Sequence, residues 1–162
     1  MADQYKEIAL IGTDDRQLAD ILTKLITKNI GVRIFTDTPE KIMVGDDANV
    51  IVSGIDFYNH NLIEESLSGY HDAILVYSDN LENPDTNDLA LKTFADTVHA
   101  ARQTGIKRLI VVASPEATQY YTSTLRRLDD LDWVYVSTEG DYADHAADEI
   151  AEPSRHKEIY EE

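Results

Sequence analysis

The sequence contains no cysteine, and this absence excludes disulfide bonds, thiolate metal sites and a cysteine nucleophile together. Long hydrophobic runs are also missing, because the longest are about half a dozen residues and a bilayer span needs roughly 20. The N-terminus lacks a basic segment followed by a long apolar one, so no secretion signal is predicted. We therefore expect a cytoplasmic protein with no membrane partner, stabilised by packing alone.

Positive charge is scarce. The 162 residues include 14 Lys and Arg against 31 Asp and Glu, which gives a net charge of -17. This charge repels the phosphate backbone, so we expect no direct binding to nucleic acid. An acidic surface can serve solubility alone or dock a basic protein partner, and it leaves the oligomeric state open. The length fits one domain, residues 1–162.

No metal site is predicted from histidine. The five histidines are scattered, without the spacing that places two ligands on one helix face: His60, His71, His99, His145 and His156. One alternative remains, in which Asp14, Asp15 and Asp37 converge and bind Mg²⁺ through carboxylate oxygens.

Short apolar segments alternate with helical ones along the whole chain. The predicted strands are residues 6–12, 31–36, 49–53, 72–77, 106–114 and 132–137. Helices are predicted over residues 14–26, 62–67, 89–102 and about 116–130, with a last one from about 141 and a polar loop over 80–86. Strands joined by helical crossovers run parallel with right-handed connections. We therefore predict an α/β fold with a doubly wound, six-stranded, mainly parallel Rossmann-type sheet of order 3-2-1-4-5-6 and helices on both faces.

Several segments, taken in order, carry a family likeness. They are Ile8-Ala9-Leu10-Ile11-Gly12, Pro39-Glu40-Lys41, Gly69 with Asp72-Ala73, Gly105-Ile106-Lys107-Arg108-Leu109, Leu131-Asp132-Trp133, Asp141-Tyr142-Ala143, Asp148-Glu149, Pro153 and His156. Over nearly its whole length the chain resembles the NmrA-like, NAD(P)H-binding branch of the atypical short-chain dehydrogenase/reductase families. The resemblance implies a Rossmann fold, bound NAD or NADP, and either reduction of small molecules such as flavins and quinones or redox sensing without turnover.

The phosphate-binding loop of such proteins is G-x-x-G-x-x-G, whose glycines allow a tight turn and close approach of the backbone to pyrophosphate. Here the seven positions read Gly12-Thr13-Asp14-Asp15-Arg16-Gln17-Leu18, so Asp15 and Leu18 replace the second and third glycines and a side chain occupies space that the phosphate would need. Leu18 is also the first of the apolar residues that recur at helical spacing after this loop. A carboxylate about 5 Å from a phosphate charge costs on the order of 3 kcal/mol at an effective dielectric near 20. Arg16 would offset part of this cost. Alternatively, Asp14 or Asp15 caps the first helix and replaces the anion at its positive end.

Two further positions belong to the candidate cofactor site. Asp37 follows the second strand, where an acidic side chain binds a ribose hydroxyl and favours NAD over NADP; it can equally be an exposed turn residue before Pro39. Ser114 ends the fifth strand. The cofactor-binding candidates are therefore Gly12, Thr13, Asp14, Asp15, Arg16, Asp37 and Ser114.

The catalytic pattern that the resemblance implies is incomplete. Classical members use a tyrosine with a lysine four residues later, which lowers the phenol pKa. Tyr120 and Tyr121 are followed at that distance by Thr124 and Leu125, and Arg126 is one residue out of register. We assign no catalytic residue. Tyr120, Tyr121 and Tyr142 could line a residual crevice at the carboxyl ends of the strands or serve packing.

The substrate-binding segment is also shortened. Relatives insert several dozen residues before the segment that matches Asp141-Tyr142-Ala143, whereas only residues 138–140 follow Ser137 here. The sequence therefore favours a non-catalytic Rossmann protein that binds a small molecule or a protein partner in a regulatory role. The alternative is an NAD(P)H-dependent oxidoreductase acting on a small acceptor such as a flavin or quinone.

Overall fold

The protein is described by a computed structural model, which covers residues 7–13, 15–44, 49–57, 59–76 and 84–160; for residues 84–91 and 93 it describes the backbone only. The strands are β1 (Glu7–Gly12), β2 (Gly31–Thr36), β3 (Val50–Gly54), β4 (Asp72–Val76), β5 (Arg108–Ala113), β6 (Asp132–Ser137) and β7 (Glu158–Ile159). The helices are α1 (Asp15–Thr27), α2 (His60–Leu67), α3 (Pro84–Thr104), α4 (Thr118–Leu125) and α5 (Tyr142–Ala151), with 3₁₀ turns η1 (Pro39–Lys41) and η2 (Pro115–Ala117).

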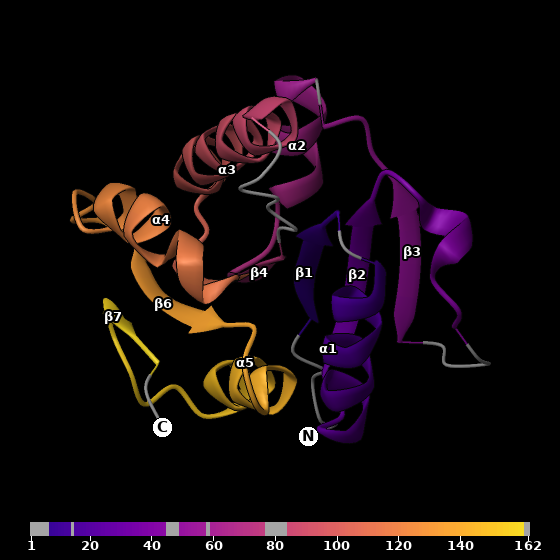
Figure 1. Cartoon of the computed structure of the whole chain (residues 1–162). Helices are drawn as coiled ribbons and strands as arrows, with labels where there is room; N and C mark the ends of the chain where they lie inside the picture. The colour runs from indigo at the N-terminus through magenta and orange to yellow at the C-terminus, as the bar shows by residue number, and fades with distance from the viewer. Residues whose placement is uncertain (1–6, 14, 45–48, 58, 77–83, 161–162) are drawn as a thin grey trace.

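The strands form one parallel sheet in the order β3-β2-β1-β4-β5-β6-β7 (Figure 1). The predicted doubly wound arrangement and the order of its six strands are therefore confirmed. The strand count was one too low, because β7 adds a parallel edge strand beside β6. With two residues, β7 is too short to show the apolar alternation by which a strand is recognised in a sequence.

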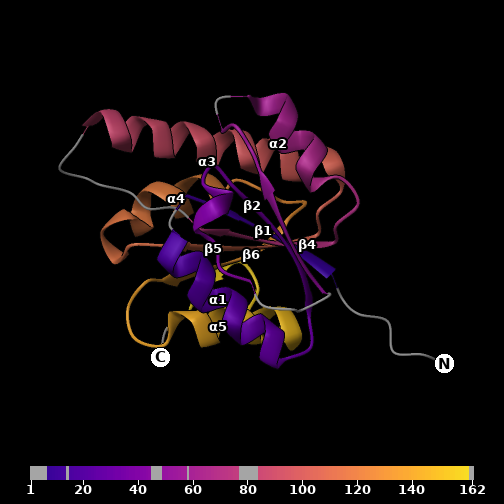
Figure 2. The ribbon, with the colours of Figure 1, turned by 90° about the vertical axis from the view of Figure 1, so that its right-hand side faces the viewer.

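Both faces of the sheet are covered, which explains why its strands are almost continuously apolar. Alternate residues of β1 enter opposite cores: Ala9 and Ile11 pack on the side of α2, α3 and α4, whereas Ile8 and Leu10 pack on the side of α1 and α5. Figure 2 shows α2 and α3 on one side of the sheet and α1 and α5 on the other. The helices thus form two layers around a central sheet.

Two helix boundaries differ from the prediction. Helix α3 begins at Pro84, inside the predicted loop 80–86, because proline is well suited to the first turn of a helix, where its missing N–H is not needed; residues 80–83 lie outside the described part of the chain. The helix predicted to reach about residue 130 begins with η2 and ends at Leu125.

The carboxyl end of β1 lies unusually close to β4. A Cβ atom placed on Gly12 would lie 2.1 Å from the carbonyl oxygen of Val76, a distance at which no side chain fits. The N–H of Thr13 donates to that same oxygen at 3.2 Å. The first glycine of the loop is therefore required by the packing of β1 against β4, and this contact fixes where the β1–α1 loop begins.

Candidate functional site

The candidate cofactor residues follow the carboxyl ends of their strands, as the topology requires. Thr13 follows β1, Asp37 follows β2 and Ser114 follows β5. Because β1 and β2 are neighbours in the sheet, the loops after them lie next to each other. Asp14 lies outside the described residues, so its predicted part in a cap, a cofactor site or a Mg²⁺ site stays a prediction.

Asp15 is the first residue of α1, and its carboxylate connects the two loops. The hydroxyl of Thr38 donates to Asp15 Oδ1 at 2.6 Å, and Lys41 Nζ lies 4.0 Å from Asp15 Oδ2. A negative charge in the first turn of a helix is stabilised by the unpaired backbone N–H groups and the helix dipole. The carboxylate therefore lies at the end of α1 where a Rossmann protein holds a pyrophosphate.

The other loop positions are divided between core and surface. Leu18, at the third glycine position, is fully buried and packs in the core between α1 and the sheet. Its place in the loop pattern indicated a side chain in the space of a phosphate. The structure instead places the Leu18 side chain in the contact between α1 and the sheet. Arg16 is exposed and remains available to an anion.

Asp37 is exposed in the turn between β2 and η1, whereas the next residue, Thr38, is the one that bonds to α1. The N–H of Thr38 also contacts the hydroxyl of buried Thr36 at 3.3 Å. Nothing in the sequence distinguished Thr38 from an ordinary turn residue before proline. Its role depends on the sheet, which brings the end of β2 beside the start of α1.

Ser114 and the tyrosines occupy separate places. The carbonyl of Ser114 accepts the hydroxyl of Tyr135 at 2.6 Å. Tyr121 is 0% exposed and packs against Phe94, with ring centroids 4.6 Å apart, whereas Tyr120 is 54% exposed. On the other face of the sheet, Tyr142 donates its hydroxyl to Asp20 at 2.7 Å. The three candidate tyrosines therefore do not line one crevice. Tyr121 serves packing, which was the alternative role predicted for these tyrosines.

The connection from β6 to α5 is short in the structure as in the sequence. Only residues 138–141 separate Ser137 from the first helical residue, Tyr142. The N–H of Thr138 donates to the carbonyl of Ala113 at 3.0 Å, which holds the start of this connection against β5. No additional wall is built from this part of the chain over the carboxyl ends of the strands.

The carboxyl edge of the sheet is acidic. Described carboxylates in the segments that follow the strands outnumber the cations there, Arg16 and Lys41. These carboxylates are Asp15, Asp37, Glu40, Asp56, Glu116, Glu139 and Asp141. This edge therefore favours a neutral or cationic ligand over an anionic one.

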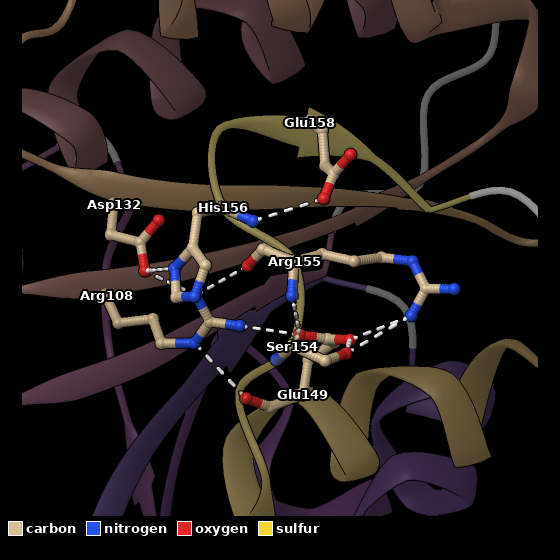
Figure 3. Close-up of polar contacts among 7 residues, drawn as sticks. All are labelled: Arg108, Asp132, Glu149, Ser154, Arg155, His156 and Glu158. Carbon is tan, nitrogen blue, oxygen red and sulfur yellow. Dashed lines mark hydrogen bonds and ion pairs between the residues drawn. The ribbon is translucent and has the colours of Figure 1, made fainter.

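The opposite, amino edge of the sheet contains buried charges that the sequence reading missed. Arg108, the first residue of β5, donates through Nη2 to Glu149 Oε1 at 2.7 Å and through Nη1 to Asp132 Oδ2 at 2.5 Å (Figure 3). Both the Arg108 and the Glu149 side chains are almost fully buried. The sequence did contain a signal for this site: Arg108 lies within the apolar strand predicted over residues 106–114. A charged side chain is buried in a core only when it has a partner, so this position predicts a buried ion pair.

No helix in the described part of the chain is long and apolar enough to cross a membrane. No group of three or more His, Asp or Glu side chains in this part of the chain is arranged to hold a metal ion.

The fold defined by this sheet order and its two helical layers is the Rossmann type. Among solved structures, a candidate epimerase from Bacteroides thetaiotaomicron is similar to this chain with a TM-score of 0.79 and 19% identity, covering 96% of this chain and 95% of that one. The NADPH-dependent quinone oxidoreductase QOR2 of Escherichia coli, solved with NADPH, has a TM-score of 0.73 and 13% identity, covering 93% of this chain and 68% of that one. The triphenylmethane reductase of Citrobacter sp., solved with NADP(H), has a TM-score of 0.72 and 14% identity, covering 94% of this chain and 68% of that one.

At these identities the likeness shows the fold, and the Rossmann fold implied by the sequence resemblance is confirmed. No protein-family model matches this sequence, and no curated protein matches it.

Proposed function

We propose that the chain is a Rossmann-type binding protein with a regulatory role, which does not turn over a nicotinamide cofactor. The observation that carries this proposal is the Asp15 carboxylate at the start of α1, bonded to Thr38 at 2.6 Å. The carboxylate supplies the negative charge that a bound pyrophosphate would otherwise bring to this helix end. It also ties the loop that holds the pyrophosphate in this fold to the loop after β2, which carries the residue that contacts the ribose hydroxyl.

The residues present do not fit a dinucleotide pyrophosphate. Gly12 is retained, but its lack of a side chain is already required by the contact with Val76. A phosphate at the start of α1 would meet Asp15, at a cost on the order of 3 kcal/mol for a separation near 5 Å at an effective dielectric of 20. With the acidic carboxyl edge, this supports a neutral or cationic ligand.

The catalytic features support the same proposal. Tyr121 is buried among aromatic side chains, and the residue four positions later is Leu125, which belongs to the same core. Tyr120 is exposed and is followed at that distance by Thr124. Neither tyrosine has the lysine that would lower its pKa for proton transfer.

Calorimetric titration with NADH, NADPH, NAD and NADP tests the proposal. We expect no binding to the wild-type chain at millimolar nucleotide. Asp15→Asn removes the opposing charge and should bring NADH binding into the measurable, submillimolar range, whereas binding to Glu65→Gln, which removes the same charge from α2, should stay undetectable. Leu18→Gly is unsuitable as a companion change, since emptying this buried position costs about 2–5 kcal/mol. Micromolar wild-type binding, or equal affinities in the two variants, would contradict the proposal.

A second candidate is an NAD(P)H-dependent oxidoreductase acting on a small acceptor such as a flavin or quinone. It is favoured by the fold likeness to a quinone oxidoreductase over 93% of this chain and by exposed Arg16 in the first turn of α1. In that case Asp37 would contact a ribose hydroxyl and favour NADH over NADPH. Oxidation of NADH by the wild-type protein with a flavin or quinone, followed at 340 nm, would establish this alternative.

A further inference from the structure

The segment after α5 is attached to the molecule mainly by polar contacts. Its apolar contacts are those of Ile159 and of Tyr160, whose ring stacks on His145 of α5 with the ring centroids 4.2 Å apart. Residues 152–160, here called the C-terminal strap, are all exposed or half-buried. Every fully buried apolar side chain in the described part of the chain precedes residue 151. From the strap, Ile159 and Tyr160 pack only partly against the two cores. The sheet and its two helical layers therefore do not depend on the strap for their packed interior.

One carboxylate holds the start of the strap. Glu149 Oε1 accepts the backbone N–H groups of Ser154 and Arg155, both at 3.1 Å. Glu149 Oε2 accepts the Ser154 hydroxyl at 2.7 Å and Arg155 Nη1 at 3.2 Å. Figure 3 shows the Glu149 side chain between Arg108 on one side and the strap on the other. Only an ionised carboxylate can accept from all of these donors at once.

The remaining contacts place the strap on the edge of the sheet. The N–H groups of Lys157 and Tyr160 donate to the carbonyls of Trp133 and Tyr135, both at 2.7 Å. Further in, Arg108 Nη1 donates to the Arg155 carbonyl at 3.1 Å. The strap thus occupies hydrogen-bonding groups of β6 that would otherwise be open to another strand.

We propose that the C-terminal strap, which includes β7, is a releasable cover of the β6 edge: the charged Glu149 carboxylate holds it in place, and loss of that charge frees it while β1 to β6 stay folded. Once the strap leaves, Glu149 is open to solvent and its charge needs no protein donor. The strap is therefore stabilised by polar contacts that water can replace, whereas the sheet is stabilised by buried apolar surface that water cannot replace.

Acid should have the same effect as loss of the charge by mutation. Burial alone would raise the pKa of Glu149, but hydrogen bonds from the Ser154 and Arg155 backbone and side chains lower it below its ordinary value, so the strap stays docked near neutral pH. The charged and titratable groups around this carboxylate come from every neighbouring element. They are Arg108 on β5, Asp132 on β6, Lys28 just after α1, Asp148 on α5, and Glu152, Arg155, His156 and Tyr160 on the strap.

Hydrogen exchange of the full chain at neutral pH tests this proposal. In Glu149→Gln the Lys157 and Tyr160 amides should exchange at least tenfold faster than in wild type, while the amides of β5 keep their rates. Asp144→Asn is the matched control, because it removes the same charge from α5 at a residue that pairs with Lys24 instead.

A second variant removes the side chains of the strap that donate to Glu149 and leaves α5 unchanged. Ser154→Ala with Arg155→Ala should also speed exchange at Lys157 and Tyr160, which keeps the test valid if Glu149→Gln does not fold. Strap rates within twofold of wild type in the folded variants would overturn the proposal. So would equal acceleration of the strap and the β5 amides, because the strap would then open only when the whole sheet unfolds.

Discussion

The two edges of the sheet use charge in opposite ways. At the carboxyl edge, carboxylates lie in the segments that follow the strands. Asp15 links two of these segments through its partly buried bond to Thr38 and its ion pair with Lys41. At the amino edge, Arg108 and Glu149 are buried and satisfied from several sides. The carboxyl edge is where Rossmann proteins bind ligands. The buried charges at the amino edge are therefore structural, because each has a partner. The carboxylates at the carboxyl edge instead oppose the anionic dinucleotide that Rossmann proteins commonly bind there.

The largest effect should come from breaking the buried pair at the amino edge. Arg108→Ala leaves the Glu149 carboxylate without its buried cation, and we expect a loss of about 3–5 kcal/mol in the free energy of unfolding. Urea denaturation measures it. Lys24→Ala, which removes a partly exposed ion pair with Asp144, should cost less than about 1 kcal/mol. Similar costs for both would mean that burial does not distinguish these pairs.

The next effect concerns the rigid point of the carboxyl edge. Gly12→Ala would place a methyl group 2.1 Å from the Val76 carbonyl oxygen, so β1 and β4 must separate, at about 2–3 kcal/mol. Gly54→Ala is the control, because its nearest neighbour is the Pro39 side chain at 3.3 Å and a small shift relieves the contact. In thermal denaturation, the melting temperature of Gly12→Ala should be well below that of Gly54→Ala. The reverse order would contradict the role given to Gly12.

A smaller effect is expected when Glu149 is protonated in place, because the side chain keeps its shape and Arg108 keeps Asp132. The pKa of Glu149 is lower in the folded protein than its ordinary value of 4.5. Its contribution to stability is therefore complete above that value and is lost as pH falls through the lower folded pKa. Wild type should lose stability relative to Glu149→Gln in this acidic range. Parallel pH profiles would show that the ionised carboxylate adds no stability.

The smallest effect should be the coupling across the carboxyl edge. Thr38→Val and Asp15→Ala remove the two ends of a partly exposed hydrogen bond, and we expect a coupling energy of about 1 kcal/mol in a double-mutant cycle. Urea denaturation of the wild type, both single variants and the double variant supplies the four values. A coupling energy near zero would mean that this bond does not hold the two loops together. Stabilising contacts between charged side chains and their partners would then be a feature of the amino edge alone among the contacts compared here.

Most of the fold could be predicted because its signals are local. The strands ending at Thr36 and Ser137 have the predicted bounds, since apolar β-branched runs between turn residues are written in the sequence itself. The strand β7 could not be predicted, because two polar-flanked residues pair only where β6 offers a free edge. Leu18 shows a mixed outcome: its helical spacing indicated the core, whereas its place in the loop pattern indicated the phosphate site.

The candidate site was predictable in position but not in its contacts. Gly12 ends β1, and Asp15, Arg16, Asp37 and Ser114 follow strands, as expected of a parallel sheet, but their part in binding stays a prediction. Thr38 is the partner of Asp15 only because β2 lies beside β1, a separation of 23 residues along the chain. No local pattern carries such a pairing.

The sequence by itself determined the succession of β1 to β6 and their helices, the net charge of -17 and the residue types in the β1–α1 loop, because each depends on residue type and short-range spacing. Tertiary structure alone decided that Asp15 bonds to Thr38, that Tyr121 is buried, and that Arg108 meets Glu149 and the C-terminal strap. These facts depend on which distant segments the sheet brings together, and on whether a charge there faces water or a partner.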